Sequence, residues 1–403
     1  MSIRISTQQI SQAAIDSMLN QQVQLSHTEQ QLSTGRKILT PADNPAGAAQ
    51  ALNLQSAIDT NTQYQSNGDA ATARLNLEQS TLQSTGNLLQ SVRTLALEGN
   101  NGTQTDASRS SIASQLSQSL KQLLALGNTQ DANGSYIFSG SQIQTKPFTQ
   151  NPNGSFSYLG DGAQRYLQID ANRQVAVNDA GSGVFMQIPN GNGSFTATPG
   201  SANTGSGIID PGSVTSSTGY SGDTYQIQFT STTQFNVVDT TSGTTVLSNQ
   251  SFQSGSTISF AGIQTSITGA PASGDQFTIA PSQPQSVFQT VQDMITALNI
   301  PSGGNAGSQA RLHNTMNQAL SSLDQAMNTL INKQAGVGSR LNAITDQQQL
   351  QSNAKLQLQT TQSQVQDLNY ASAISLFNQQ LAGLQASQKT YLQVQGLSLF
   401  KYI

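Results

Sequence analysis

Residues 323–344, LDQAMNTLINKQAGVGSRLNAI, carry the pattern that decides the fold of this chain. One residue in every three or four keeps the same phase through the whole stretch, past Gly336 and Gly338. These positions are Leu323, Met327, Leu330, Gln334, Val337, Leu341 and Ile344. Alternating spacing of this kind puts side chains on one stripe of a helix, which packs against a partner helix. The stretch therefore predicts a long helix within a helical bundle.

The same spacing returns at both chain ends, where more of its positions are polar. The C-terminal set is Ile374, Phe377, Leu381, Leu384, Gln388, Tyr391 and Gln395, and the N-terminal set is Ile15, Met18, Gln22, Leu25, Glu29 and Leu32. A stripe that polar gives a lone helix little to hold it in place. We therefore expect both end helices to become ordered mainly on contact with other helices.

Between these helical zones, residues 141–284 change to glycine, serine, threonine and short alternating apolar runs, which are typical of β-strands. Asn153-Gly154 lies between Phe148 and Phe156 and predicts a hairpin turn. Residues 222–227, GDTYQI, are loosely repeated at 274–279, GDQFTI, which hints at paired β units. The Gly/Ser-rich residues 190–222 are expected to form loop.

These zones predict an α+β multidomain fold. A long antiparallel helical bundle or coiled coil, built from both chain ends, is expected to carry an inserted β-rich domain. The predicted parts are an N-terminal assembly helix (1–45), the N-terminal half of a helical core domain (46–140), a β-rich outer region (141–284, with about 190–280 its most variable part), the C-terminal half of the core domain (285–365) and a C-terminal assembly helix (366–403).

The composition suits a chain that packs against many copies of itself. Only 9% of the 403 residues are charged, whereas ordinary soluble domains carry roughly 25%. The 16 Lys and Arg against 20 Asp and Glu leave a net charge of −4, with no basic stripe to neutralise phosphates, so we expect no nucleic-acid partner. The absence of cysteine excludes disulfides, thiol catalysis and Cys-ligated zinc.

The sequence shows no membrane-spanning segment. No apolar run approaches the roughly 20 residues that cross a bilayer. The first residues, MSIRISTQQISQAAID, also lack the apolar core of a cleavable secretory signal. We therefore expect no membrane insertion, and if the protein leaves the cell, a route other than signal-peptide secretion.

No residue pattern indicates catalysis. His27 and His313 are the only histidines, and they lie far apart in helical zones, which favours solvated helix faces over metal ligands. Ser352 and Lys355 have the S-x-x-K spacing of penicillin-binding enzymes, but the companion S-D-N and K-T-G motifs are missing. We predict no catalytic, cofactor-binding or metal site and no enzymatic activity.

The candidate functional residues are instead the apolar side chains of the two chain ends, which little else in one subunit is left to cover. From the N-terminal end they are Ile3, Ile5, Ile10, Ile15, Met18, Leu25 and Leu32. From the C-terminal end they are Ile374, Phe377, Leu381, Leu384, Tyr391, Leu397, Leu399 and Phe400. Together they are predicted to form an assembly interface.

Several strings at both ends resemble the bacterial flagellin superfamily. They include LSTGRKI at 32–38, PADNPAG at 41–47, SVRTLAL at 91–97 and VQDLNYA at 365–371. This resemblance covers roughly the helical two-thirds of the chain. Ordered similarity at both ends is much more specific than one short motif.

Within that superfamily, three strings are more similar to the hook–filament junction branch, the hook-associated protein 3 family, than to flagellin. These are NGSYIFSG at 133–140, VGSRLN at 337–342 and the closing LSLFKYI at 397–403. The stretch 190–280 carries no family string, so its role stays unassigned.

The resemblance implies a mechanism of assembly at the bacterial flagellum. The chain would be exported unfolded by the flagellar type III pathway, with a cytosolic chaperone on its C-terminal amphipathic region. It would self-assemble into a short junction ring between the first hook-associated protein and flagellin. Helices from both chain ends would line the inner tube, and the β domain would face outward.

Two other readings stay open. Flagellin itself, the filament subunit, is the nearer alternative, although the Tyr136–Gly140 string and the aromatic tail favour the junction branch. An adhesive surface module on a helical stalk is the second, because the β zone is rich in Thr, Ser and Asn.

Overall fold

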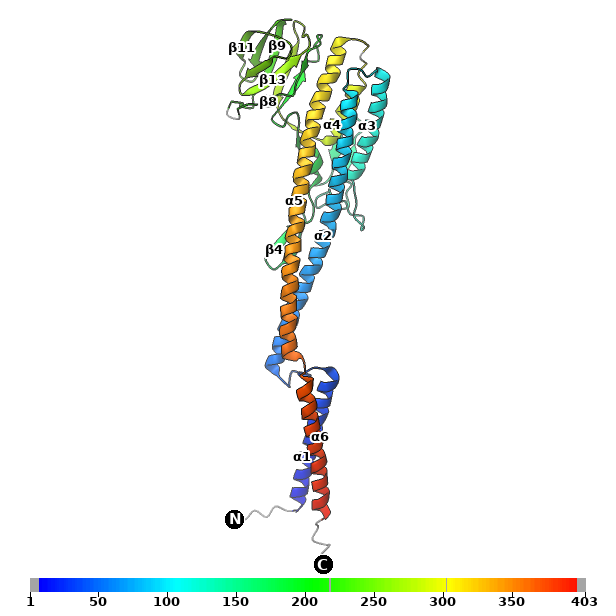
Figure 1. Cartoon of the computed structure of the whole chain (residues 1–403), viewed down its shortest axis with the longest axis vertical. Coiled ribbons are helices and arrows are strands. Elements are labelled where there is room, and N and C mark those ends of the chain that lie inside the picture. The colour runs from blue at the N-terminus through cyan, green and yellow to red at the C-terminus, as the bar shows by residue number, and fades with distance from the viewer. Residues whose placement is uncertain (1–6, 217–218, 302, 397–403) are drawn as a thin grey trace, which may run out of the picture. The chain divides into compact units, whose positions relative to one another are not determined.

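The computed structural model describes residues 7–216, 219–301 and 303–396. The chain divides into two compact units, Met1–Ser66 with Gln347–Ile403 (unit 1) and Asn67–Asp346 (unit 2). The predicted fold class is confirmed, since helices at both ends flank a β-rich middle (Figure 1). The five-part division drawn from the sequence stays a prediction.

Six α-helices form the described helical part of the chain. They are α1 (Thr7–Thr34), α2 (Pro45–Gly99), α3 (Asp106–Gly127), α4 (Val287–Leu298), α5 (Ala306–Gln366) and α6 (Tyr370–Gly396). One π-helical turn, η1 (Ser182–Met186), precedes the second half of the β region.

The helix ends follow from local chemistry. Pro45 starts α2, where its missing N–H costs nothing, and the Asn44 side chain accepts from the Gly47 N–H at 2.9 Å. Ser286 caps α4 by accepting from the Gln289 N–H at 3.0 Å. Helix α4 ends at Leu298 and α5 begins at Ala306, and Pro301 between them cannot donate a helical hydrogen bond.

Within unit 2, α2 and α5 pack antiparallel along the stripe that the sequence predicted. Leu323, Leu330, Val337 and Ile344 are buried, and the intervening Met327, Gln334 and Leu341 are half-buried. On α2 the facing residues Leu75, Leu82, Leu89, Val92 and Ala96 are fully buried. Arg93 Nε lies 2.9 Å from Asp324 Oδ1 and Asn100 Nδ2 lies 2.9 Å from Asn317 Oδ1, which fixes the antiparallel register.

An aromatic cluster completes this core where the β region begins. Phe138, Phe148, Phe185 and Phe288 are fully buried against one another, with ring centroids between 5.1 and 5.7 Å apart. They come from the loop after α3, from β1, from η1 and from α4, so the first half of the β region is anchored to the helices.

The β region before residue 190 consists of short hairpins. Strands β1 (Phe148–Gln150) and β2 (Phe156–Tyr158) pair antiparallel around the predicted Asn153-Gly154 turn. A second hairpin joins β3 (Tyr166–Asp170) and β4 (Arg173–Ala176). Strand β5 (Ile188–Pro189) pairs with β15 (Pro284–Gln285), so the segment between them begins and ends at one place.

That segment contains the β module, defined here as residues 195–281. One sheet has the order β11-β10-β9-β14-β6 and the other β12-β13-β7, with β8 also on β13. The strands are β6 (Phe195–Pro199), β7 (Ile208–Ile209), β8 (Ser213–Val214), β9 (Tyr225–Ser231), β10 (Gln234–Asp239), β11 (Thr244–Ser251), β12 (Thr257–Phe260), β13 (Ile263–Thr268) and β14 (Gln276–Pro281). Apolar side chains of both sheets enclose a second core. The prediction that residues 190–222 form loop is therefore wrong in part, because this stretch contains β6, β7 and β8.

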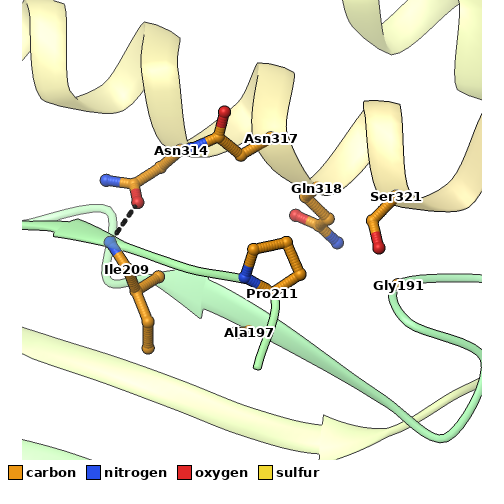
Figure 2. Close-up of a pocket in the computed structure, with 8 residues that line it drawn as sticks. All are labelled: Gly191, Ala197, Ile209, Pro211, Asn314, Asn317, Gln318 and Ser321. Atoms are coloured by element: carbon orange, nitrogen blue, oxygen red, sulfur yellow. Dashed lines mark hydrogen bonds between the residues drawn. The ribbon is translucent and has the colours of Figure 1, made fainter. Parts of the chain in front are cut away.

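Polar side chains of α5 hold the β module. Asn314 Oδ1 accepts from the Ile209 N–H at 2.8 Å, and its Nδ2 donates to the Gly207 carbonyl at 3.0 Å (Figure 2). Just before the module, Ser322 Oγ accepts from the Gly191 N–H at 2.9 Å. A cavity of about 10 Å³ lies between these contacts, and Figure 2 shows Asn317, Gln318 and Ser321 along its helix side. The contact is polar, unlike the apolar cores on either side of it.

Candidate assembly surface

Unit 1 contains the two end helices, which run side by side in Figure 1. Ser11 Oγ lies 3.2 Å from the Tyr391 hydroxyl, and Thr28 Oγ1 lies 2.8 Å from Gln380 Oε1, so the helices are antiparallel. The positions turned toward the partner form the inner seam. On α1 they are Ala14, Ile15, Met18, Gln21, Leu25, Thr28 and Leu32, and on α6 they are Ala373, Phe377, Gln380, Leu381, Leu384, Ser387 and Tyr391.

The predicted assembly residues fall into three groups in this arrangement. Eight of them lie half-buried in the inner seam: Ile15, Met18, Leu25, Leu32, Phe377, Leu381, Leu384 and Tyr391. Ile10 and Ile374 are exposed in the single chain, and their burial in an assembled interface stays a prediction. Ile3, Ile5, Leu397, Leu399 and Phe400 lie outside the described residues.

The polar positions of the predicted stripes were assigned one residue out of place. Gln22 and Glu29 are exposed, and Gln21 and Thr28 take the inner positions. Both choices satisfy alternating spacing of three and four, so spacing alone cannot separate them. Thr28 is 3% exposed, and its small hydroxyl reaches Gln380 there. The charged Glu29 would lose its hydration at the same place without gaining a partner.

The same shift occurs on α6. Gln388 and Gln395 are exposed, whereas Gln380 and Ser387 face α1. Gln395 Nε2 instead donates to the Tyr391 hydroxyl at 2.8 Å on its own helix. The inner seam thus holds four amide or hydroxyl side chains, Gln21, Thr28, Gln380 and Ser387, at positions other than the sequence predicted.

A second set of apolar side chains on these helices points away from the inner seam. Val23 is 69% exposed and Leu392 is 67% exposed. Leu19 on α1, and Leu376 and Val394 on α6, are also exposed. The predicted stripes do not include these five residues, because their positions do not fit the three/four spacing. Each end helix has more apolar residues than one stripe can hold, and that surplus indicates a second apolar face.

The part of α2 and α5 that belongs to unit 1 also turns large apolar side chains outward. Gln347 and Gln351 are buried, whereas Leu52, Leu350 and Leu356 are exposed, Leu52 by 71%. Across residues 45–66 and 347–366 the only charged residues are Asp59 and Lys355. Two amides therefore lie inside this helix pair together with Ala51 and Ile58, and leucines on a nearly uncharged surface face outward.

Two linkers, between α1 and α2 and between α5 and α6, meet in unit 1. The Lys37 N–H donates to the Gln366 carbonyl at 2.7 Å, and the Leu368 N–H donates to the Gly35 carbonyl at 2.9 Å. Gly35 has φ +68°, and a Cβ there would lie 2.7 Å from the Tyr370 hydroxyl, so both its conformation and the space require glycine. The LSTGRKI and VQDLNYA strings, far apart in sequence, thus form one joint.

Asp43 organises the first of these linkers. Its Oδ2 accepts from the Thr40 N–H at 2.8 Å and from the Leu39 N–H at 3.0 Å, and Oδ1 lies 3.1 Å from His27 Nε2. The Thr40 N–H, with smaller contributions from Leu39 and His27, holds the pKa of Asp43 below its ordinary value. His27 therefore has a structural partner.

The part of the chain that the structure describes contains no group of three or more His, Cys, Asp or Glu placed to hold a metal ion. His313 Nδ1 lies 2.8 Å from Asn100 Oδ1 in unit 2, in a different unit from His27. No described helix has the length and apolar content that crossing a membrane requires.

Comparisons with known proteins agree with this arrangement. A family model described as the bacterial flagellin N-terminal helical region matches residues 5–143. Hook-associated protein 3 of Legionella pneumophila, a solved structure, is 32% identical with a TM-score of 0.74, and the match covers 77% of this chain and 98% of that one. The chain belongs to the flagellar hook-associated protein 3 family.

Other matches refine this assignment. Hook-associated protein 3 of Escherichia coli K12 is 24% identical over 399 residues, 99% of each chain. A Clostridium tyrobutyricum flagellin is 28% identical over only 114 residues, 28% of this chain. Residues 198–281, most of the β module, match a model described as the D2-like domain of flagellar hook-associated protein 1.

Membership of the hook-associated protein 3 family confirms the resemblance predicted from the terminal strings. The chain is a structural protein of the bacterial flagellum and not an enzyme. The flagellin alternative has only a match over 28% of this chain. The β module, whose role the sequence left unassigned, is similar to a domain of another flagellar protein.

Proposed function

We propose that this chain forms the junction between the flagellar hook and the filament, where copies of it assemble through unit 1. The observation that carries the proposal is the set of large apolar side chains that unit 1 exposes. Val23 on α1, Leu392 on α6 and Leu52 on α2 face outward, while several inner positions of the unit are amides or hydroxyls. Exposed apolar side chains on nearly uncharged helices are stabilised when neighbouring copies cover them, and little charge repulsion opposes their approach.

The partners follow from this position. The first hook-associated protein would contact the ring on the hook side and flagellin on the filament side. The match of the β module to a domain of hook-associated protein 1 supports a shared outer architecture. A cytosolic chaperone would cover α6 before export by the flagellar type III pathway, because this helix exposes Leu376, Leu392 and Val394.

Deletion of the gene tests the junction role. Cells without this chain are expected to keep hooks, to lack attached filaments and to shed monomeric flagellin into the medium. A filament subunit gives a different result, because its deletion leaves no flagellin to shed. Filaments that stay attached in the deletion strain would refute the proposal.

Complementation with Val23→Asp/Leu392→Asp tests the surface itself. Both side chains point away from the inner seam, so the pairing of α1 with α6 should survive while assembly is lost. Val246→Asp, an exposed apolar position on β11 of the β module, is the matched control and should restore motility. If the paired variant also restores motility, unit 1 does not assemble through this face.

A further inference from the structure

A carboxyl group is buried where α2, α5 and the β3–β4 hairpin meet in unit 2. Glu78 lies on α2 and is 1% exposed. Its Oε1 accepts from the Asp179 N–H at 3.0 Å. Its Oε2 is buried and has no hydrogen-bond partner among the described residues. A carboxylate in that position would carry a charge that nothing neutralises.

The nearest charges do not supply a counter-ion. Arg340 on α5 pairs through Nη2 with Asp179 Oδ2 and donates through Nη1 to the Ala176 carbonyl at 3.3 Å. Gln164 Nε2 donates to the other Asp179 oxygen at 3.1 Å. The Arg340 guanidinium is thus taken up by Asp179, which places a second negative charge beside Glu78.

The remaining charged groups that face this cluster are Arg165, Arg74 and Asp131. Arg74 Nη2 pairs with Asp131 Oδ2 at 3.6 Å. Arg165 stands at the start of the hairpin, where burial first and Arg74 second lower the pKa of its guanidinium against a smaller attraction to Asp131 and Glu78, and its Nε is buried without a hydrogen-bond partner. None of these groups lies within ion-pair distance of Glu78 in the described part of the chain.

Burial first, and the Asp179 carboxylate second, raise the pKa of Glu78 to about 8, against a smaller opposing effect of Arg340. The group is therefore a neutral acid at pH 7. A neutral carboxyl accepts from the Asp179 N–H and leaves no bare charge in the core, which explains how the structure tolerates it.

We propose that Glu78 is a proton-operated latch, which fastens residues 161–181 to the helices while it carries its proton and releases them when the proton is lost. After ionisation, Glu78 and Asp179 repel each other, and the hairpin segment lifts so that water reaches the carboxylate. Residues 161–181 also place Ile169, Val175 and Val177 in the main core, so release of the segment separates these side chains from that core, whereas the β module has a core of its own.

The direction of the pH effect follows from linkage. The folded chain holds a proton at Glu78 that the unfolded chain, with an ordinary Glu value of 4.5, has already lost. The stabilisation is complete below pH 4.5 and is lost as pH rises through about 8. Acid keeps the latch closed, and alkaline solution opens it.

Hydrogen exchange of the full-length purified subunit tests the latch. The protection factors of amides in residues 165–179 are expected to fall about tenfold for each pH unit between pH 4.5 and pH ~8 and to level off above pH ~8, because in that interval opening releases one proton. Amides of the β module serve as the internal reference and should keep their protection factors. Glu78→Gln, which keeps the acceptor oxygen but cannot ionise, should abolish the fall.

Glu98→Gln is the matched control, because Glu98 is exposed on the same helix, and it should behave as the natural chain does. Constant protection of residues 165–179 between pH 6 and 10 in the natural chain would overturn the proposal. So would an equal fall in Glu78→Gln. If Glu78→Gln does not fold, the comparison of the hairpin segment with the β module in the natural chain decides alone.

Discussion

The α2–α5 pair of unit 2 and the α1–α6 pair of unit 1 share one residue spacing and differ in what fills it. In unit 2 the stripe is mainly apolar, with Leu323, Leu330, Val337 and Ile344 buried against fully buried apolar residues of α2, and α3, α4 and the aromatic cluster pack around it. In unit 1 the inner seam includes Gln21, Thr28, Gln380 and Ser387, and no described residue of unit 1 belongs to either apolar core. Spacing sets which helices meet, whereas side-chain chemistry sets whether they stay together without other copies.

The largest expected effect comes from placing charges in the inner seam of unit 1. Phe377→Asp/Leu384→Asp should abolish filament attachment and weaken chaperone binding, because unpaired carboxylates would be placed in the seam between α1 and α6. The thermal transition of unit 2 should not change, since neither residue belongs to its core. Calorimetry of the purified variant, beside motility and flagellin-shedding assays, measures both.

Ser375→Asp/Ala382→Asp is the control for that variant. These exposed residues lie on the same helix with the same separation of seven and add the same charge. Attached filaments are expected with the control. If the control also loses filaments, added charge on α6 is sufficient, and the inner seam has no special role.

A matched pair of truncations measures the difference between the two helix pairs in free energy. Leu82→Ala removes a fully buried side chain from unit 2 and should lower its free energy of unfolding by about 2–5 kcal/mol. Leu25→Ala, at a half-buried seam position in unit 1, should leave the main urea transition of the monomer unchanged. Equal shifts from the two variants would show that unit 1 folds cooperatively with unit 2.

The same contrast explains what the sequence could predict. Every apolar member of the stripe from Leu323 to Ile344 lies where the spacing put it. At polar positions the phase was ambiguous, because glutamine and threonine are accepted both inside and outside a seam. Within the α1–α6 pair the helix phase therefore differs from the spacing at Gln22 and Glu29, where the tertiary partner decided.

The β region shows a second limit. The echo of residues 222–227 in 274–279 did identify neighbours, since β9 pairs with β14 and Tyr225 lies opposite Ile279. The strand order β11-β10-β9-β14-β6 depends on contacts between distant residues that no local pattern contains. Glu78 gave no signal either, because a glutamate on a helix is ordinarily solvated, and its burial requires the hairpin at 161–181.

Removal of the β module should have a smaller effect than either substitution. The module has its own core, and β5 and β15 bring its two ends together, so replacing residues 195–281 with a short Gly/Ser linker should preserve the helical core. We expect the thermal transition of the helices to persist and junction assembly and export to continue. Complete loss of motility in a folded, secreted deletion variant would show that the module takes part in assembly.

The smallest expected effect concerns one polar contact in the inner seam. It tests whether polar side chains alone make the helix pair of unit 1 less stable than that of unit 2. Thr28 Oγ1 has a single proton, which it donates either to Gln380 Oε1 at 2.8 Å or to the Gln24 carbonyl at 3.0 Å. Thr28→Val should weaken the α1–α6 pair by about 1 kcal/mol, because Gln380 loses a partner inside the seam. Adding Gln380→Leu should reverse the loss, since replacing both partners by apolar groups leaves no unsatisfied atom.

The rate at which a protease cleaves the two chain ends of the purified monomer measures each step of this cycle. If the double variant becomes slower to cleave than the natural chain, the polar side chains are what keep unit 1 loose until copies assemble. If it is cleaved at the natural rate, the missing support of further helices such as α3 and α4 is the cause, and the polarity of the seam is secondary.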